Sequence, residues 1–75
     1  MKTKYLVRVV WMLENGEIQS MIKKTDYHVI AEGFFNNYCS LMEKSPYLGI
    51  KRVSLYEDGY EIERRIEENG RQIRN

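Results

Sequence analysis

The chain has 75 residues, a length that supports one small domain with a marginal hydrophobic core. Twelve basic and eleven acidic residues give a formal net charge of +1, which argues against a strong binder of polyanions. The single cysteine excludes an internal disulfide and a cysteine-based metal site, and no apolar stretch approaches the roughly 20 residues of a membrane span. We therefore expect a soluble intracellular protein whose residues 1–75 form a single domain.

The first two predicted elements are strands at residues 4–13 and 17–24, separated by Asn15-Gly16. An X-Gly pair of this type supplies the positive φ angles of a tight two-residue hairpin turn. In that register Val9 lies opposite Ile22. The same face, which we expect to pack against a helix, also carries Tyr5, Val7 and Trp11.

Between residues 26 and 44 the apolar residues recur at spacings of three and four. They are Tyr27, Ile30, Ala31, Phe34, Tyr38, Leu41 and Met42. This spacing is typical of a helix with one buried face. Thr25 or Asp26 can cap its first turn, and Ser45-Pro46 ends it. A helix of about 18 residues is about 27 Å long, which matches a strand of about eight residues, so it can lie along one face of a sheet.

Two further strands are predicted at residues 50–57 and 60–66, on either side of Asp58-Gly59. This turn places Leu55 opposite Ile62, on the helix side with Val53. The first strand is the most apolar and should be central. A strand order of 2-1-3-4 makes all neighbours antiparallel and allows a right-handed crossover through the helix. We predict an α+β fold of ββαββ type, in which one amphipathic helix packs on a four-stranded antiparallel sheet.

The C-terminal stretch admits three interpretations. Ile62, Ile66 and Ile73 fit a helical stripe, whereas residues 60–66 also fit a fourth strand. Residues 68–71, with the sequence ENGR, can form the turn of a third hairpin that sets Ile73 opposite Ile66. We favour the fourth strand, with an ordered core over residues 4–66 and a tail at 67–75 that is frayed or forms a short extra hairpin.

The sequence shows no convergent set of catalytic groups, and we expect no enzymatic activity, cofactor or metal. His28, the only histidine, lies at the start of the predicted helix, where an exposed or capping role is the simpler interpretation. Cys39 lies past the middle of that helix, away from the helix N-terminus and from the cations that activate a thiol. Phosphate-loop, dinucleotide-binding and nucleophile-elbow motifs do not occur in the sequence.

The opposite face of the first hairpin is also apolar. In the predicted register it presents four large side chains, Leu6, Val10, Met12 and Met21. A contiguous exposed apolar patch usually marks an interface, and two-fold pairing lets one patch cover its own copy. We therefore predict a homodimer through these four residues. In the alternative, the C-terminal tail folds back over this face, with Ile73 as the plug.

A second set of residues on the same face can contact a partner or nucleic acid. It consists of Arg8, Lys23, Arg52, Tyr56 and Arg65. Aromatic side chains on a sheet can stack bases while Lys and Arg hold phosphates. In this register Glu61, Glu63 and Glu67 project from the same face and oppose phosphate. Binding of nucleic acid or a nucleotide is therefore our second choice, after binding of a host protein.

Three segments, VRVVWMLENGEIQSMI, TDYHVIAEGFF and VSLYEDGYEIERR, make up most of residues 4–66. In this arrangement the chain resembles small accessory proteins of bacteriophages and other bacterial mobile elements, in which a hairpin, an amphipathic helix and an LYEDG-type hairpin cover almost the whole chain. The resemblance implies a protein in the cytoplasm of a bacterial host that binds, and often inhibits, a host factor such as a component of host immunity. Some such proteins instead sequester a signalling nucleotide between the subunits of an oligomer. The resemblance assigns no catalytic residue.

Overall fold

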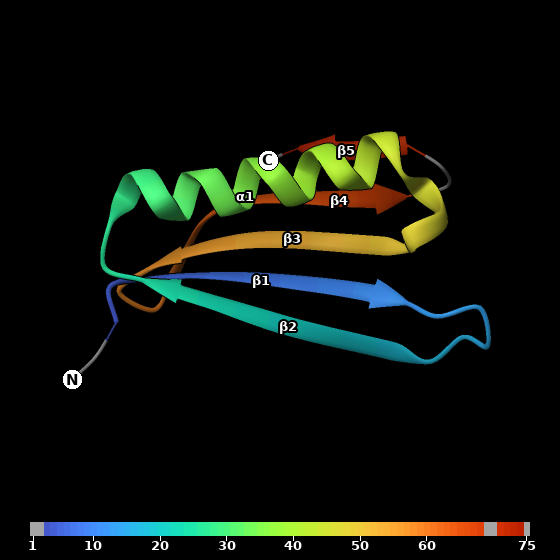
Figure 1. Cartoon of the computed structure of the whole chain (residues 1–75), viewed down its shortest axis with the longest axis horizontal. Helices are drawn as coiled ribbons and strands as arrows, with labels where there is room; N and C mark the ends of the chain where they lie inside the picture. The colour runs from blue at the N-terminus through green and yellow to red at the C-terminus, as the bar shows by residue number, and fades with distance from the viewer. Residues whose placement is uncertain (1–2, 69–70, 75) are drawn as a thin grey trace.

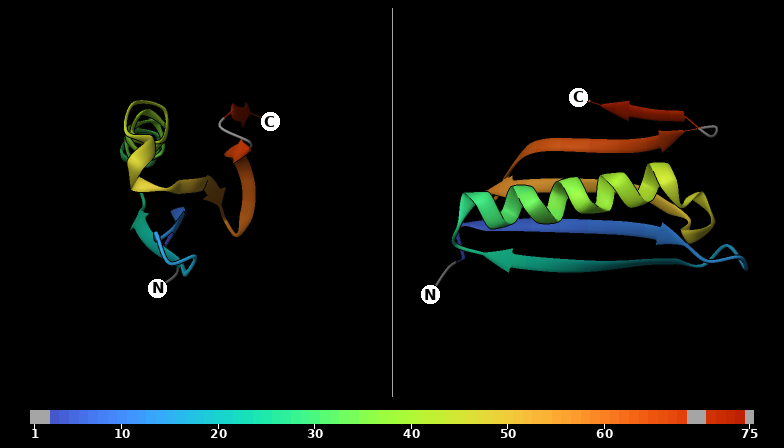
Figure 2. Two further views of the ribbon diagram at one scale, coloured as in Figure 1. Left: turned by 90° about the vertical axis from the view of Figure 1, so that its right-hand side faces the viewer. Right: turned by 45° about the horizontal axis from the view of Figure 1, so that its top comes forward.

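The computed structural model describes residues 3–68 and 71–74. In chain order they form β1 (Tyr5–Met12), β2 (Ile18–Thr25), α1 (His28–Lys44), the short 3₁₀ helix η1 (Pro46–Leu48), β3 (Ile50–Glu57), β4 (Tyr60–Glu68) and β5 (Arg71–Arg74). The strands make one antiparallel sheet in the order β2-β1-β3-β4-β5 (Figure 1). α1 packs on one face, against β1, β2 and β3, whereas the sheet curves so that β4 and β5 rise beside the helix (Figure 2).

The predicted α+β fold and the strand order 2-1-3-4 are confirmed, and β5 extends the sheet beyond β4. β5 pairs with β4 so that Ile73 lies opposite Ile66. The favoured fourth strand is confirmed as β4, the helical stripe is wrong, and the pairing of β5 agrees with the short extra hairpin. Residues 69 and 70, which belong to the predicted turn, lie outside the described residues.

The core lies between α1 and the central strands. Successive side chains of a strand point to opposite faces, and β1 and β3 turn their most apolar sets toward α1. The buried apolar residues are Tyr5, Val7, Val9, Ala31, Phe35, Cys39, Met42, Ile50, Val53 and Leu55. Tyr27 and Ile30, predicted to be buried, are exposed, because the buried stripe of α1 runs through Phe35 and Cys39.

The loop before α1 ties the helix to the start of β1. Neither Thr25 nor Asp26 caps the helix, contrary to prediction, because both side chains accept other backbone hydrogen bonds. Thr25 Oγ1 accepts from the N–H of Tyr27 at 3.2 Å, and Asp26 Oδ1 accepts from the N–H of Lys4 at 2.9 Å. At its other end α1 stops before Pro46, as predicted.

The β1–β2 hairpin has a longer turn than predicted. The N–H of Gly16 donates to the carbonyl of Leu13 at 2.9 Å, and the N–H of Leu13 donates to the carbonyl of Glu17 at 2.8 Å, which leaves a three-residue loop. Gly16 (φ +87°) has the left-handed conformation that closes such a loop. The extra residue shifts the register by one, so that Val9 lies opposite Met21.

This shift exchanges the faces of the β2 side chains, because the side-chain period of a strand is two. Met21 and Lys23, predicted on the face away from the helix, lie on the helix side instead, and Met21 packs against the core. Both predictions are therefore wrong. Ile18 and Ile22 take their place on the opposite face.

The β3–β4 hairpin has the predicted two-residue turn, in which Asp58 (φ +51°) and Gly59 (φ +86°) both have positive φ. The N–H of Asp58 donates to the carbonyl of Lys4 at 2.8 Å, which fastens this turn to the residue before β1. The backbone of Lys4 is thus held from two sides, by Asp26 and by Asp58.

A β-bulge displaces most of β4 by one residue. The register shifts after the turn, so that Leu55 lies opposite Glu63 and not opposite Ile62, as predicted. A bulge of this kind changes the face of every later residue in the strand. Arg64 consequently lies on the face away from the helix. The residues that the bulge places on the helix side, contrary to prediction, are Glu63, Arg65 and Glu67.

Candidate functional site

The sheet face turned away from α1, which we call the outer face, is not covered by the helix (Figure 2). It is built by alternate residues of four strands. Across the strands these residues form the rows Lys24-Leu6-Tyr56-Glu61, Ile22-Arg8-Ser54-Arg64, Ser20-Val10-Arg52-Ile66 and Ile18-Met12. The outer face divides into an apolar part, a polar cluster and a hollow.

The apolar part follows the first hairpin. The exposed fractions are 39% for Met12, 57% for Ile18 and 44% for Ile22, and Leu6 and Val10 are half-buried. We call these five residues the apolar strip. The structure places Leu6, Val10 and Met12 on this face, as expected. β5 lies at the far edge of the sheet, next to β4, so the C-terminal strand does not fold back over the apolar strip.

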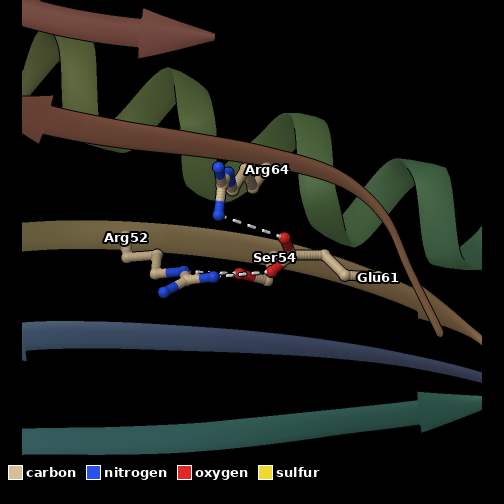
Figure 3. Close-up of polar contacts among 4 residues, drawn as sticks. All are labelled: Arg52, Ser54, Glu61 and Arg64. Atoms are coloured by element: carbon tan, nitrogen blue, oxygen red, sulfur yellow. Dashed lines mark hydrogen bonds and ion pairs between the residues drawn. The ribbon is translucent and has the colours of Figure 1, made fainter. Parts of the chain in front are cut away.

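The polar cluster lies on β3 and β4 and consists of Arg52, Ser54, Glu61 and Arg64 (Figure 3). Arg52 donates from Nε to Ser54 Oγ at 3.0 Å and from Nη2 to Glu61 Oε2 at 2.8 Å. Arg64 Nη1 lies 3.6 Å from Glu61 Oε1. Ser54 is only 1% exposed, although it lies on the outer face.

Glu61 is the charge centre of the polar cluster. Partial burial acts to raise the pKa of its carboxyl, but hydrogen bonds from Arg52 and Ser54 and the positive charges of Arg52 and Arg64 outweigh it and lower the pKa below the ordinary value of 4.5. Two guanidinium groups therefore share one carboxylate within this cluster.

The hollow lies where β1 begins, has a volume of about 510 Å³, and is lined by Thr3, Lys4, Leu6, Arg8, Lys24, Tyr56 and Gly59. Lys4 Nζ is 3.8 Å from Glu57 and 4.0 Å from Asp58, two long contacts at the rim. The side chains of Arg8 and Lys24 make no hydrogen bond or ion pair with any other residue that the structure describes. The hollow thus has two cations without a carboxylate partner in that part of the chain, next to an aromatic ring.

Of the residues predicted to contact a partner or nucleic acid, the structure brings Arg8 and Tyr56 together in the hollow and places Arg52 in the polar cluster. Lys23 and Arg65 lie on the other side of the sheet. The sequence reasoning missed three cations on or beside the outer face, Lys4, Lys24 and Arg64. The correct strand registers would have revealed Lys24 and Arg64, because the one-residue shifts in β2 and β4 move Lys23 and Arg65 to the helix side and bring these neighbours to the outer face.

The other candidate groups lie on α1. His28 is half exposed; its Nδ1 lies 3.5 Å from Glu32 Oε1, one turn later, and its ring centroid lies 5.3 Å from that of Tyr5. Cys39 is buried in the core. Within residues 3–68 and 71–74, no three His, Cys, Asp or Glu side chains are grouped closely enough to hold a metal ion. No helix in this part of the chain has the length and apolar character needed to cross a membrane.

Comparison of the chain with protein-family models, with curated proteins and with solved structures gives no match. The chemistry of the outer face is therefore the basis on which a function can be argued.

Proposed function

We propose that this chain is a non-enzymatic binding protein, an accessory protein of bacteriophage type, that acts in the bacterial cytoplasm by occupying the surface of a host macromolecule. The outer face is its contact surface, and the apolar strip pairs two copies into a homodimer. The observation that carries the proposal is the exposure of Met12, Ile18 and Ile22 on a sheet face that the helix leaves open.

Self-pairing is the simplest way to cover the apolar strip. A two-fold axis sets the strip against its own copy, so one set of residues supplies both sides of the interface. Burial of apolar surface contributes about 25 cal/mol per Å², which matters for a chain of 75 residues with a small core of its own. The two arginines of the polar cluster on the neighbouring strands are already paired with Glu61, and the cluster can form a polar rim beside the strip.

The test is the light-scattering mass of the purified chain at tens of micromolar. We expect a dimer whose mass does not change between low and high salt, because an apolar interface responds little to ionic strength. Val10→Glu places a charge in the middle of the strip and should give a monomer.

Val29→Glu is the matched control, since Val29 is 80% exposed on α1, far from the outer face. It should remain a dimer. A monomeric parent protein, or a Val10→Glu variant that still dimerises, would rule out the strip as the dimer interface.

A second candidate function is binding of nucleic acid or of a signalling nucleotide. It is favoured by Arg8 and Lys24 beside Tyr56, and by the bulge in β4. The bulge turns Glu63 and Glu67 to the helix side, so the opposition to phosphate expected from these two carboxylates is absent from the outer face. Such binding should weaken steeply with salt, whereas an apolar contact should not.

A further inference from the structure

We infer that the hollow at the start of β1 binds one small nucleotide, with its phosphate groups on Arg8 and Lys24 and its base against Tyr56 and Leu6. The inference rests on the second candidate function and specifies its site and ligand. The hollow and the apolar strip share Leu6, whereas Val10, Met12 and Ile18 lie toward the other end of the hairpin, so ligand binding and dimer mass are measured separately.

The register sets the spacing of the groups in the hollow. Leu6 lies opposite Lys24 on one side and opposite Tyr56 on the other, with Arg8 two residues along the same strand. Directly opposite residues have Cβ atoms about 5 Å apart, and diagonal neighbours about 7–8 Å. Arg8 is diagonal to both Lys24 and Tyr56. Its long side chain and that of Lys24 can therefore converge on one phosphate group while Tyr56 remains within the length of a nucleotide.

The rim of the hollow is held in place before any ligand arrives. The backbone N–H of Lys4 donates to Asp26, and its carbonyl accepts from Asp58, so the β2–α1 loop and the β3–β4 turn both fix this residue. Gly59, also in the lining, has open space where a Cβ would point. A fixed rim lowers the ordering cost of binding. The volume of about 510 Å³ lies in the range of small-molecule sites.

The distribution of charge favours a small ligand over a nucleic acid strand. A nucleic acid strand needs a continuous track of cations along the protein surface. Here Glu57 and Asp58 border the hollow on the side of the β3–β4 turn, and Glu61 lies next to Tyr56 on the neighbouring strand. In the other direction the outer face continues into Val10, Met12 and Ile18. Among the described residues of the outer face, the cations without a partner are Arg8 and Lys24, and both line the hollow, where they suit the two or three charges of a nucleoside diphosphate.

The experiment is a calorimetric titration of the full chain at 50 mM salt with four probes, ADP, adenosine, pyrophosphate and a 12-nucleotide single-stranded DNA. We expect ADP to bind more tightly than either of its parts. Lys24→Gln or Arg8→Gln should weaken ADP about tenfold, because each removes a charge-assisted hydrogen bond. Tyr56→Leu should weaken ADP about fivefold or more through lost stacking and leave pyrophosphate unchanged.

Lys23→Gln is the matched control, since it removes the same charge from the adjacent residue on the other face. It should change ADP affinity less than twofold. The inference is overturned if ADP does not bind at millimolar concentration, if Lys24→Gln has no more effect than Lys23→Gln, or if only the oligonucleotide binds. The last result would point to nucleic acid instead. A salt-stable dimer that does not bind ADP would be consistent with the proposed protein interface and would rule out the nucleotide site alone.

Discussion

The two hairpins contribute to the same outer face but leave their charges in different states. On β3 and β4, Arg52 and Arg64 share the carboxylate of Glu61, and Ser54 is buried beneath them (Figure 3). On β1 and β2, by contrast, Arg8 and Lys24 have no partner in the described residues and lie beside exposed apolar side chains. Both halves place cations on this face, yet only those of the β3–β4 half are paired with a carboxylate within the described part of the fold.

The difference separates a structural role from a binding role. A buried or half-buried charge that is already paired gains little from an incoming ligand, because binding must first break its existing hydrogen bonds. An exposed cation without a partner keeps its full capacity to bind an anion. The β1–β2 half therefore supplies the cations of the candidate contact surface, with Tyr56 of β3 beside them, and the paired cluster on β3 and β4 serves mainly to stabilise the sheet.

The largest effect on stability is expected where the two halves join. The N–H of Met12 at the end of β1 donates to the carbonyl of Gly49 just before β3, at 2.9 Å. Gly49 has φ +73°, and a Cβ there would collide with the carbonyl oxygen of Met12. Gly49→Ala should lower the free energy of unfolding by about 2 kcal/mol or more, measured by urea denaturation.

Gly33→Ala provides the matched control, because Gly33 lies within α1 and a Cβ there meets nothing within 4 Å. Alanine in a helix is favoured over glycine, so this variant should gain about 0.5–1 kcal/mol of stability. If both variants lose stability, the collision with the carbonyl oxygen of Met12 does not explain the loss of stability in Gly49→Ala.

An intermediate effect is expected from the same substitution in each half of the outer face. Arg52→Gln removes the hydrogen bonds to Ser54 and Glu61 and should cost about 1 kcal/mol in unfolding free energy. Arg8→Gln removes an exposed charge without a described partner and should stay within about 0.5 kcal/mol of the parent. If the two variants lose equal stability in thermal or urea unfolding, the contrast between the halves is not real.

Much of the fold could be read from local signals. The Asp58-Gly59 turn requires two positive φ values, which this pair supplies, and the strand order follows from the apolar character of the first strand. The length of the loop at Asn15-Gly16 could not be decided from the local sequence. The pair fits a two-residue turn, but Gly16 alone also closes a three-residue loop. Packing decides between them, because the longer loop turns Met21 into the core.

The candidate site depended on these long-range choices. No local sequence feature marks the bulge in β4, because Ile62 continues the alternating pattern of apolar residues. The bulge brings Arg64 beside Glu61 on the outer face, and this ion pair accounts for it. Lys4 was missed because two segments far along the chain, at Asp26 and Asp58, hold it at the rim. Residues at sites built from several strands are therefore the hardest to predict from sequence.

The smallest effect concerns the pH dependence of the β3–β4 half. Because the pKa of Glu61 is lowered in the folded chain, its ionised form stabilises the fold above the unfolded value of 4.5, and this stability is lost as the pH falls through the folded pKa. Glu61→Gln should therefore lower the unfolding free energy at pH 7 by about 0.5–1 kcal/mol, reduced by solvent screening. At pH 3 the difference from the parent should be smaller, because a larger fraction of Glu61 is protonated there than at pH 7 and a protonated glutamate resembles glutamine. Urea unfolding of both proteins at the two pH values cancels the titration of the other carboxylates. A difference that is the same at pH 7 and pH 3 would show that Glu61 acts through packing, and that the pairing of charges does not distinguish the two halves.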